Sequence, residues 1–108
     1  MSENFTYARF AGHLGDVFRV HAGPADVVAL ELVQATDLGS RSDMAGGEGA
    51  PGQGERFSLL FQGPHDRLLP QGTYPFEHDQ IGSFPLFIVP VGAAQGGPQY
   101  EAVFNRLE

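Results

Sequence analysis

Alternation of apolar and polar residues is the feature of this sequence that most constrains its fold. Between residues 56 and 62, Phe57, Leu59 and Phe61 alternate with more polar neighbours. Because successive side chains of a strand point to opposite faces, this pattern predicts a strand with one buried face. Similar patterns predict strands at residues 16–22, 27–38, 73–78, 83–91 and 99–105. We therefore expect an all-β fold, a small antiparallel β-barrel or sandwich of about six strands.

The side chains expected to face a common interior are largely aromatic and aliphatic. They are Phe18, Val20, Leu30, Leu32, Phe57, Leu59, Phe61, Tyr74, Phe76, Tyr100, Ala102 and Phe104. The first two segments are joined by a short link that contains Gly23-Pro24, and such a short link predicts a hairpin.

The fifth segment is apolar on both faces, with Phe84, Leu86 and Ile88 on one and Phe87, Val89 and Val91 on the other. Such a strand is typically central or covered on each side. Since proline has no N–H for a sheet ladder, we expect Pro90 to end the strand and Pro85 to mark a local irregularity.

The N-terminal stretch departs from the alternating pattern. Thr6 can cap a short helix over residues 7–11 that Gly12 would end, with Tyr7 and Phe10 on one face. The alternative is a short strand with Phe5 and Tyr7 pointing inward.

The length of 108 residues fits a single β domain over residues 1–108. Residues 39–54 are rich in glycine and are expected to form a flexible loop. This loop contains a G-x-G-x-x-G match from Gly47 to Gly52. Dinucleotide binding requires a buried strand before this motif and a helix after it, and neither is predicted here.

Composition excludes several kinds of chemistry. The chain has no cysteine and no lysine, so disulfides, thiolate catalysis and Schiff-base chemistry are excluded. The net charge of -7 and the absence of a basic run argue against nucleic acid and anionic membranes as partners. The N-terminus has no signal-peptide pattern, and no apolar run approaches the roughly 20 residues of a membrane-spanning helix. We expect a cytoplasmic protein.

Four histidines, His13, His21, His65 and His78, are the candidate metal ligands. Carboxylates adjoin two of them, in His65-Asp66 and Glu77-His78-Asp79, but neighbouring strand residues point to opposite faces. Whether the four histidines converge stays open. We predict no metal site, no cofactor and no cofactor-binding residues.

Catalytic residues are not indicated either. Ser58 lies within an expected strand and Ser83 begins another, and neither has the strained turn that activates a nucleophilic serine. Arg19 and Arg56 are expected to pair with Glu31 or Glu101 across the sheet.

Several segments carry a family resemblance. FSLLFQGP, LLPQGTYPFEHDQIGSFPLFIVPVG and YEAVFN, together with FAGHLGDVFRV and LELVQATDLG, resemble an uncharacterised bacterial family of domains of unknown function. Its members are often encoded near phage-tail-collar-like (microcystin-dependent) proteins. The resemblance covers most of the chain outside the glycine-rich loop and transfers no catalytic residue. It implies an assembly factor or small structural component of a phage-tail-like system.

Two functions from different classes follow. The first is a non-enzymatic β-domain that associates with a protein partner or with copies of itself, using the second apolar face of residues 83–91 if that face is exposed. The alternative is a small-molecule, glycan or metal binding domain, or an enzyme, that uses a polar barrel mouth near His13, His21 and His78.

Overall fold

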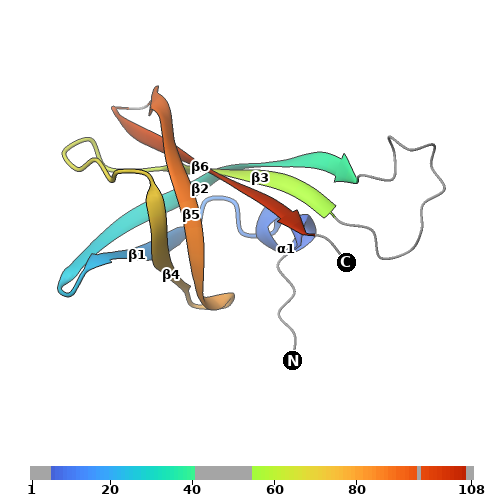
Figure 1. The fold of residues 1–108 in the computed structure, drawn as a ribbon, viewed down its shortest axis with the longest axis horizontal. Coiled ribbons are helices and arrows are strands. Elements are labelled where there is room, and N and C mark those ends of the chain that lie inside the picture. Colours follow the sequence, from blue (N-terminus) through green and yellow to red (C-terminus); the bar gives the residue numbers. More distant parts are fainter. Residues whose placement is uncertain (1–5, 41–54, 95, 107–108) are drawn as a thin grey trace.

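The computed structural model describes residues 6–40, 55–94 and 96–106, and these form one closed antiparallel β-barrel (Figure 1). The strands neighbour one another in the order β1-β2-β3-β6-β5-β4. The elements are α1 (Tyr7–Ala11), β1 (Val17–Gly23), β2 (Asp26–Ser40), β3 (Glu55–Gln62), β4 (Gly72–His78), β5 (Gly82–Ala94) and β6 (Gly97–Arg106). The all-β prediction is confirmed, and the closed ring of strands selects the barrel over the sandwich.

Each predicted strand overlaps an observed one, and the ends coincide or differ by at most three residues. The hairpin of β1 and β2 is confirmed by their antiparallel pairing. The glycine-rich loop was expected from Gly39, but β2 continues to Ser40, which pairs with Glu55. Residues 41–54, the remainder of that loop, lie outside the described residues, and so does the Gly47–Gly52 motif.

The core is formed by the inward faces of the strands, as the alternation predicts. Its buried members are Phe10, Phe18, Val20, Val28, Leu30, Leu32, Phe57, Leu59, Phe61, Leu69, Phe76, Ile81, Phe84, Leu86, Ile88, Tyr100 and Ala102. Tyr74 and Phe104 are partly buried and pack against this cluster. Interdigitated aromatic rings fill the interior, and burial of their apolar area is the main stabilising contribution of such a core.

The N-terminal segment is a helix, which decides between the two alternatives left open by the sequence. The Oγ1 of Thr6 accepts a hydrogen bond from the N–H of Arg9 at 3.1 Å, and Gly12 is the C-cap. A helix of five residues is not stable in isolation, because nucleation costs more free energy than one turn of hydrogen bonds returns. Phe10, which is fully buried, therefore supplies the stabilisation through tertiary contacts.

The ring of Phe10 lies 5.4–6.4 Å from the rings of four phenylalanines on four different strands, Phe18, Phe57, Phe84 and Phe104. Figure 1 shows α1 beside the C-terminal end of β6, at one end of the barrel. The helix thus closes that end with a single aromatic side chain.

Both proline predictions for the fifth strand are wrong. Pro85 lies opposite Pro75 of β4 in a ladder without any register shift, so it is not an irregularity. Two facing prolines fit a regular ladder where no N–H is required between the strands. Pro90 does not end β5 either. The strand continues to Ala94, and a register shift against β6 between Pro90 and Gly92 accommodates the missing donor.

Of the two alternatives for the fifth strand, the central one holds: β5 lies between β4 and β6, and its second face is exposed. The side chains of Phe87 and Val91 are 50% and 49% exposed, whereas Leu86 and Ile88 are buried. The ring of Phe87 therefore points away from Phe76 and Phe84, which are buried on the inner face.

The turn between α1 and β1 is tied to β2 by two backbone hydrogen bonds. The N–H of Gly15 donates to the carbonyl of Leu32 at 2.8 Å, and the N–H of Leu32 donates to the carbonyl of Asp16 at 3.0 Å. Gly15 has φ +90°, which other residues rarely adopt. Gly82, at the start of β5, likewise has a positive φ, +100°. The turn fixes the position of His13 and Asp16 relative to the barrel.

Candidate functional site

The four histidines do not converge on one site. His13 and His78 meet at Asp16, whereas His21 lies on the outer surface against Glu77 and His65 is exposed in the loop after β3. A polar barrel mouth shared by His13, His21 and His78 is therefore not present. The two converging histidines, which are 65 positions apart in the sequence, define the candidate site.

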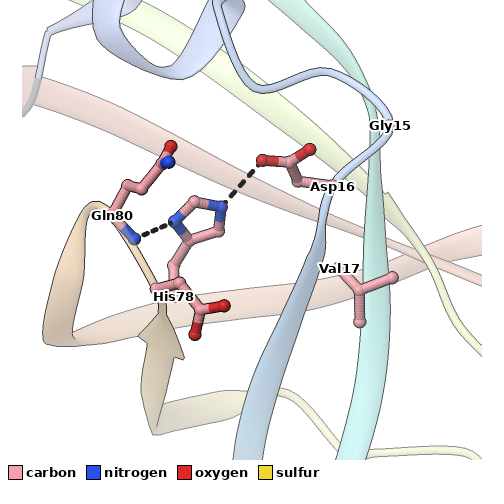
Figure 2. A pocket seen from close by; sticks show the side chains of 6 residues that line it. Gly15, Asp16, Val17, His78 and Gln80 are labelled. Atoms are coloured by element: carbon pink, nitrogen blue, oxygen red, sulfur yellow. Dashed lines mark hydrogen bonds and ion pairs between the residues drawn. The ribbon is translucent and has the colours of Figure 1, made fainter.

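His78 is the one buried polar or charged side chain among the described residues, and its hydrogen bonds determine where its proton lies. Its Nδ1 accepts hydrogen bonds from the backbone N–H groups of Gln80 at 3.0 Å and Ile81 at 3.1 Å. Nδ1 therefore carries no proton, and the neutral ring carries it on Nε2. Nε2 donates to Oδ2 of Asp16 at 2.9 Å. Figure 2 shows Asp16 and Gln80 on opposite sides of the ring.

Asp16 links the two histidines. Its Oδ2 also accepts a hydrogen bond from Nδ1 of His13 at 3.0 Å, and the two imidazole rings meet edge to face at 4.7 Å. The hydrogen bond from His78, followed by that from His13, lowers the pKa of Asp16 below its ordinary value of 3.8. Asp16 is thus an ionised carboxylate that connects the α1–β1 turn to the end of β4.

The cluster has the residue types of a metal site but not the required protonation. One ligand atom each from His13, Asp16 and His78 lie within 4.8 Å of one another. A metal-bound histidine, however, normally donates its second ring N–H to an acceptor. The second nitrogen of His78 faces two N–H donors instead, so a metal at Nε2 would need a fully deprotonated ring. The hydrogen bonding fits a structural cluster better than a metal site, and the prediction of no metal site stays a prediction.

An open pocket of about 380 Å³ adjoins the cluster, lined by Gly15, Asp16, Val17, His78, Asp79 and Gln80 (Figure 2). Neither Ser58 nor Ser83 lines it. A hydroxyl or thiol nucleophile beside a histidine base is one common arrangement for covalent hydrolysis. The residues that line this pocket lack a hydroxyl or thiol group, so this arrangement is not formed here, and the pocket offers carboxylates, an imidazole and an amide.

A second polar group lies on the outer surface of β1 and β4. Glu77 faces Arg19 in the register and accepts a hydrogen bond from Nε2 of His21 at 2.9 Å. The His21 hydrogen bond is the main reason why the pKa of Glu77 lies below its ordinary value of 4.5. Arg19 also contacts Asp79, with Nη2 and Oδ1 3.1 Å apart. All these side chains are substantially exposed, so the ion pairs among them contribute little to stability.

The predicted arginine pairs are wrong. Arg19 pairs with Glu77 and Asp79, not with Glu31 or Glu101, because β1 has β4 as its second neighbour. Arg56 forms no ion pair within the described part of the chain, and its buried Nε has no hydrogen-bond partner there. Strand order, which alternation does not reveal, decides which charges meet.

The outer face of β3, β5 and β6 carries an apolar surface that we call the outer patch, formed by Leu60, Phe87, Val89 and Val103. Val103 is 58% and Phe87 50% exposed, and Leu60 and Val89 are partly exposed. In the register, Glu101 lies between Leu60 and Val89, and it is two residues from Val103 on the same face. The outer patch therefore surrounds a carboxylate.

A groove of about 510 Å³ lies on the outer face of β2, β3 and β6. We call it the Glu31 groove, and it is lined by Glu31, Val33, Gln62 and Gln99. Gln62 faces both Glu31 and Gln99 in the register, and Leu60 of the outer patch is two residues from Gln62 on the same face. The groove and the outer patch are neighbours.

The fold and these sites define a small β-barrel with one end closed by a helix, a structural His–Asp–His cluster and an exposed apolar face. None of the described helices is long and apolar enough to span a membrane. The family described as "Domain of unknown function (DUF6916)" matches residues 5–104, and the chain belongs to this family. No curated protein and no solved structure matches the chain.

Proposed function

We propose that this barrel is a non-enzymatic module that associates with another protein through the outer patch. The observation that carries the proposal is the exposure of Phe87 and Val103, two large apolar side chains on regular strands of the barrel. Single exposed apolar residues are common, but a group of them on one face is typical of an interaction surface. Aromatic side chains at the centre of such a surface contribute most of the binding free energy.

The setting we propose is a phage-tail-like assembly. The support for this setting is the resemblance of the sequence segments to proteins encoded near phage-tail-collar-like proteins. A small rigid barrel with an apolar face is suited to a permanent place in such a particle, since obligate interfaces are rich in apolar contacts.

Quantitative affinity purification from cells that naturally express the protein tests the association. Wild-type protein and Leu68→Ser are expected to enrich the same proteins, because Leu68 is 65% exposed but lies in the loop between β3 and β4. A Phe87→Ser/Val103→Ser variant with unchanged circular dichroism is expected to lose them. Equal enrichment by all three proteins would overturn the proposal.

A second candidate, ligand binding, is favoured by the pocket next to His78. Its volume of about 380 Å³ lies in the range of small-molecule sites, and Asp16 and Asp79 supply acceptors. A thermal-shift screen with nucleotides, sugars and amines tests it. A ligand at a hundred times its Kd is expected to stabilise the fold by about 2.7 kcal/mol, and absence of any shift would count against this candidate.

A further inference from the structure

We propose that the partner is basic, and that the Glu31 groove takes a lysine or arginine side chain from it while its apolar residues pack on the outer patch. This inference rests on the proposed function and specifies the chemistry of the partner. It follows from the hydrogen-bonding capacity of the groove, from the unpaired carboxylates on this face and from the charge of the chain.

The lining side chains of the groove offer more free acceptors than free donors, since the amide N–H groups of Gln62 are used and the amide of Gln99 keeps one N–H beyond its bond to Gln62. The Nε2 of Gln62 donates to the carbonyl of Ala94 at 2.8 Å, and its Oε1 accepts from Nε2 of Gln99 at 3.1 Å. The side-chain oxygen Oε1 of Gln99 and the carboxylate of Glu31 remain as acceptors. An occupant that satisfies them must bring donors, and a positive charge is favoured beside Glu31.

Two carboxylates on this face have no counter-charge among the described residues. Neither Glu31 nor Glu101 forms an ion pair with a residue in the described ranges, whereas Arg19 and Arg67 are already paired with Glu77, Asp79 and Asp26. Arg56 is on the same face of β3, but it lies six residues from Gln62, towards the far end of the strand. The groove end of the surface is therefore acidic.

Apolar side chains stand beside both carboxylates. Val33 lines the groove with Glu31, and Leu60 and Val89 flank Glu101. The long aliphatic stem of a lysine or arginine packs on such side chains while its charged end reaches the carboxylate. This arrangement favours a long basic side chain over a small cation.

The net charge of the chain argues against a second copy as the occupant. At -7, two identical molecules repel each other, whereas a basic partner is attracted and oriented before contact. Two copies would also bring Glu31 and Glu101 of both molecules into one interface, and Arg56, on the same face, lies six residues from Gln62 towards the far end of β3. A heterologous basic partner is the occupant that fits this face.

Two labelled peptides of about eight residues test the inference by fluorescence anisotropy, one alternating leucine and arginine and the other alternating leucine and glutamate. The leucine–arginine peptide is expected to bind wild-type protein at least about tenfold more tightly. A Glu31→Gln/Glu101→Gln variant should lose about tenfold in affinity for it, and added salt should weaken wild-type binding. Asp66→Asn, which removes an exposed carboxylate from the loop after β3, should lose much less.

The outcomes separate this inference from the function on which it rests. Equal binding of both peptides, no binding of either, or equal losses in the Asp66→Asn and Glu31→Gln/Glu101→Gln variants would overturn the basic partner. Leucine–arginine binding that survives Phe87→Ser/Val103→Ser would overturn the role of the outer patch instead. Light scattering is expected to show a monomer. A dimer that the Phe87→Ser/Val103→Ser variant no longer forms would overturn the basic partner, because a second copy would then be the occupant. Association through the outer patch would still hold in that case.

Discussion

At the scale of single residues, the position of one proton on His78 distinguishes a structural cluster from a metal site. Two backbone N–H groups point at Nδ1, so the ring presents an N–H rather than a lone pair to Asp16. The ring also lies 4.5 Å from that of Phe18, which places the polar cluster directly on the aromatic core. A buried imidazole whose two nitrogens are both hydrogen-bonded costs the fold little and fixes the turn after β4.

The pKa of Asp16 predicts how stability depends on pH. Because the folded-state pKa lies below the unfolded value of 3.8, the carboxylate contributes stability that is fully present above pH 3.8. This contribution is lost as the pH falls through the folded-state pKa. Asp26 and Glu77 have pKa values lowered by Arg67 and His21 respectively, and they act in the same direction. We expect the free energy of unfolding to fall steeply below about pH 4.

Urea unfolding between pH 7 and pH 2 measures this effect. Asp16→Asn is expected to be less stable than wild type at pH 7 and to lose less stability on acidification. Asp66→Asn serves as the control for removal of a carboxylate in general. An Asp16→Asn variant with the same pH profile as wild type would show that this cluster does not contribute to the acid sensitivity.

The protonation of His78 also predicts the response to metal ions. Equimolar Zn²⁺ is expected to leave Tm unchanged in a thermal-shift measurement at neutral pH, since Nε2 of His78 has no free lone pair. A rise in Tm that His78→Ala abolishes and His21→Ala preserves would contradict this account and establish a site at His13, Asp16 and His78.

At the scale of elements, α1 has a structural role out of proportion to its length. Five residues form one turn, yet Phe10 contacts phenylalanines from β1, β3, β5 and β6. Arg9 adds a long contact from its guanidinium to the carbonyl of Gln80, at 3.4 Å, beside the His78 turn. The helix therefore joins the closed end of the barrel to the cluster.

Removing the ring of Phe10 is expected to destabilise the whole barrel. Phe10→Ala should cost about 3–5 kcal/mol, because the residue is fully buried and its neighbours are anchored in strands that cannot collapse into the space. Leu14→Ala, at a half-exposed position just after the helix, should change stability by less than about 0.5 kcal/mol. Chemical denaturation of both variants measures the difference, and a Phe10→Ala cost near that of Leu14→Ala would mean that α1 is dispensable.

At the scale of the whole molecule, closure of the barrel depends on contacts between distant segments. β1 pairs with β4 at only two positions, Arg19 with Glu77 and Val20 with Phe76. The loop between β3 and β4 reinforces the closed arrangement. Its Arg67 pairs with Asp26 at the start of β2, and the backbone N–H of Leu69 donates to the hydroxyl of Tyr100 at 2.8 Å. The loop, which connects β3 to β4, thus also contacts β2 and β6.

Much of the secondary structure and of the buried core can be predicted from local sequence. Alternation identified five strands and most of the core, because the period of two reflects the geometry of an extended chain with one buried face. The remaining strand, β5, was indicated by a short run that is apolar on both faces. Thr6 and Gly12 marked the ends of α1. The pairing of His13 with Asp16, three residues apart across a turn, had a local signal, but the approach of His78 from 62 positions further along did not.

The errors have a common physical origin. The predicted strand end at Pro90 and the predicted ion-pair partners of Arg19 are wrong for the same reason. The effect of a proline on a ladder and the partner of a charged side chain both depend on the neighbouring strand. Gly97 is a further example. A side chain there would collide with the carbonyl of Gly63, a constraint that exists only because β6 begins against the end of β3. Such constraints have no counterpart within a short window of sequence.

By itself, therefore, the sequence determined the strands, their buried faces and the chemistries that a chain without cysteine and lysine lacks, since these follow from local geometry and composition. Only the tertiary structure decided the strand order, and with it the burial of Phe10, the meeting of His13, Asp16 and His78, and the exposure of Phe87 and Val103 beside Glu101. The physical reason is that burial and charge pairing are properties of surfaces brought together by folding, whereas alternation records only that each strand has an inside and an outside.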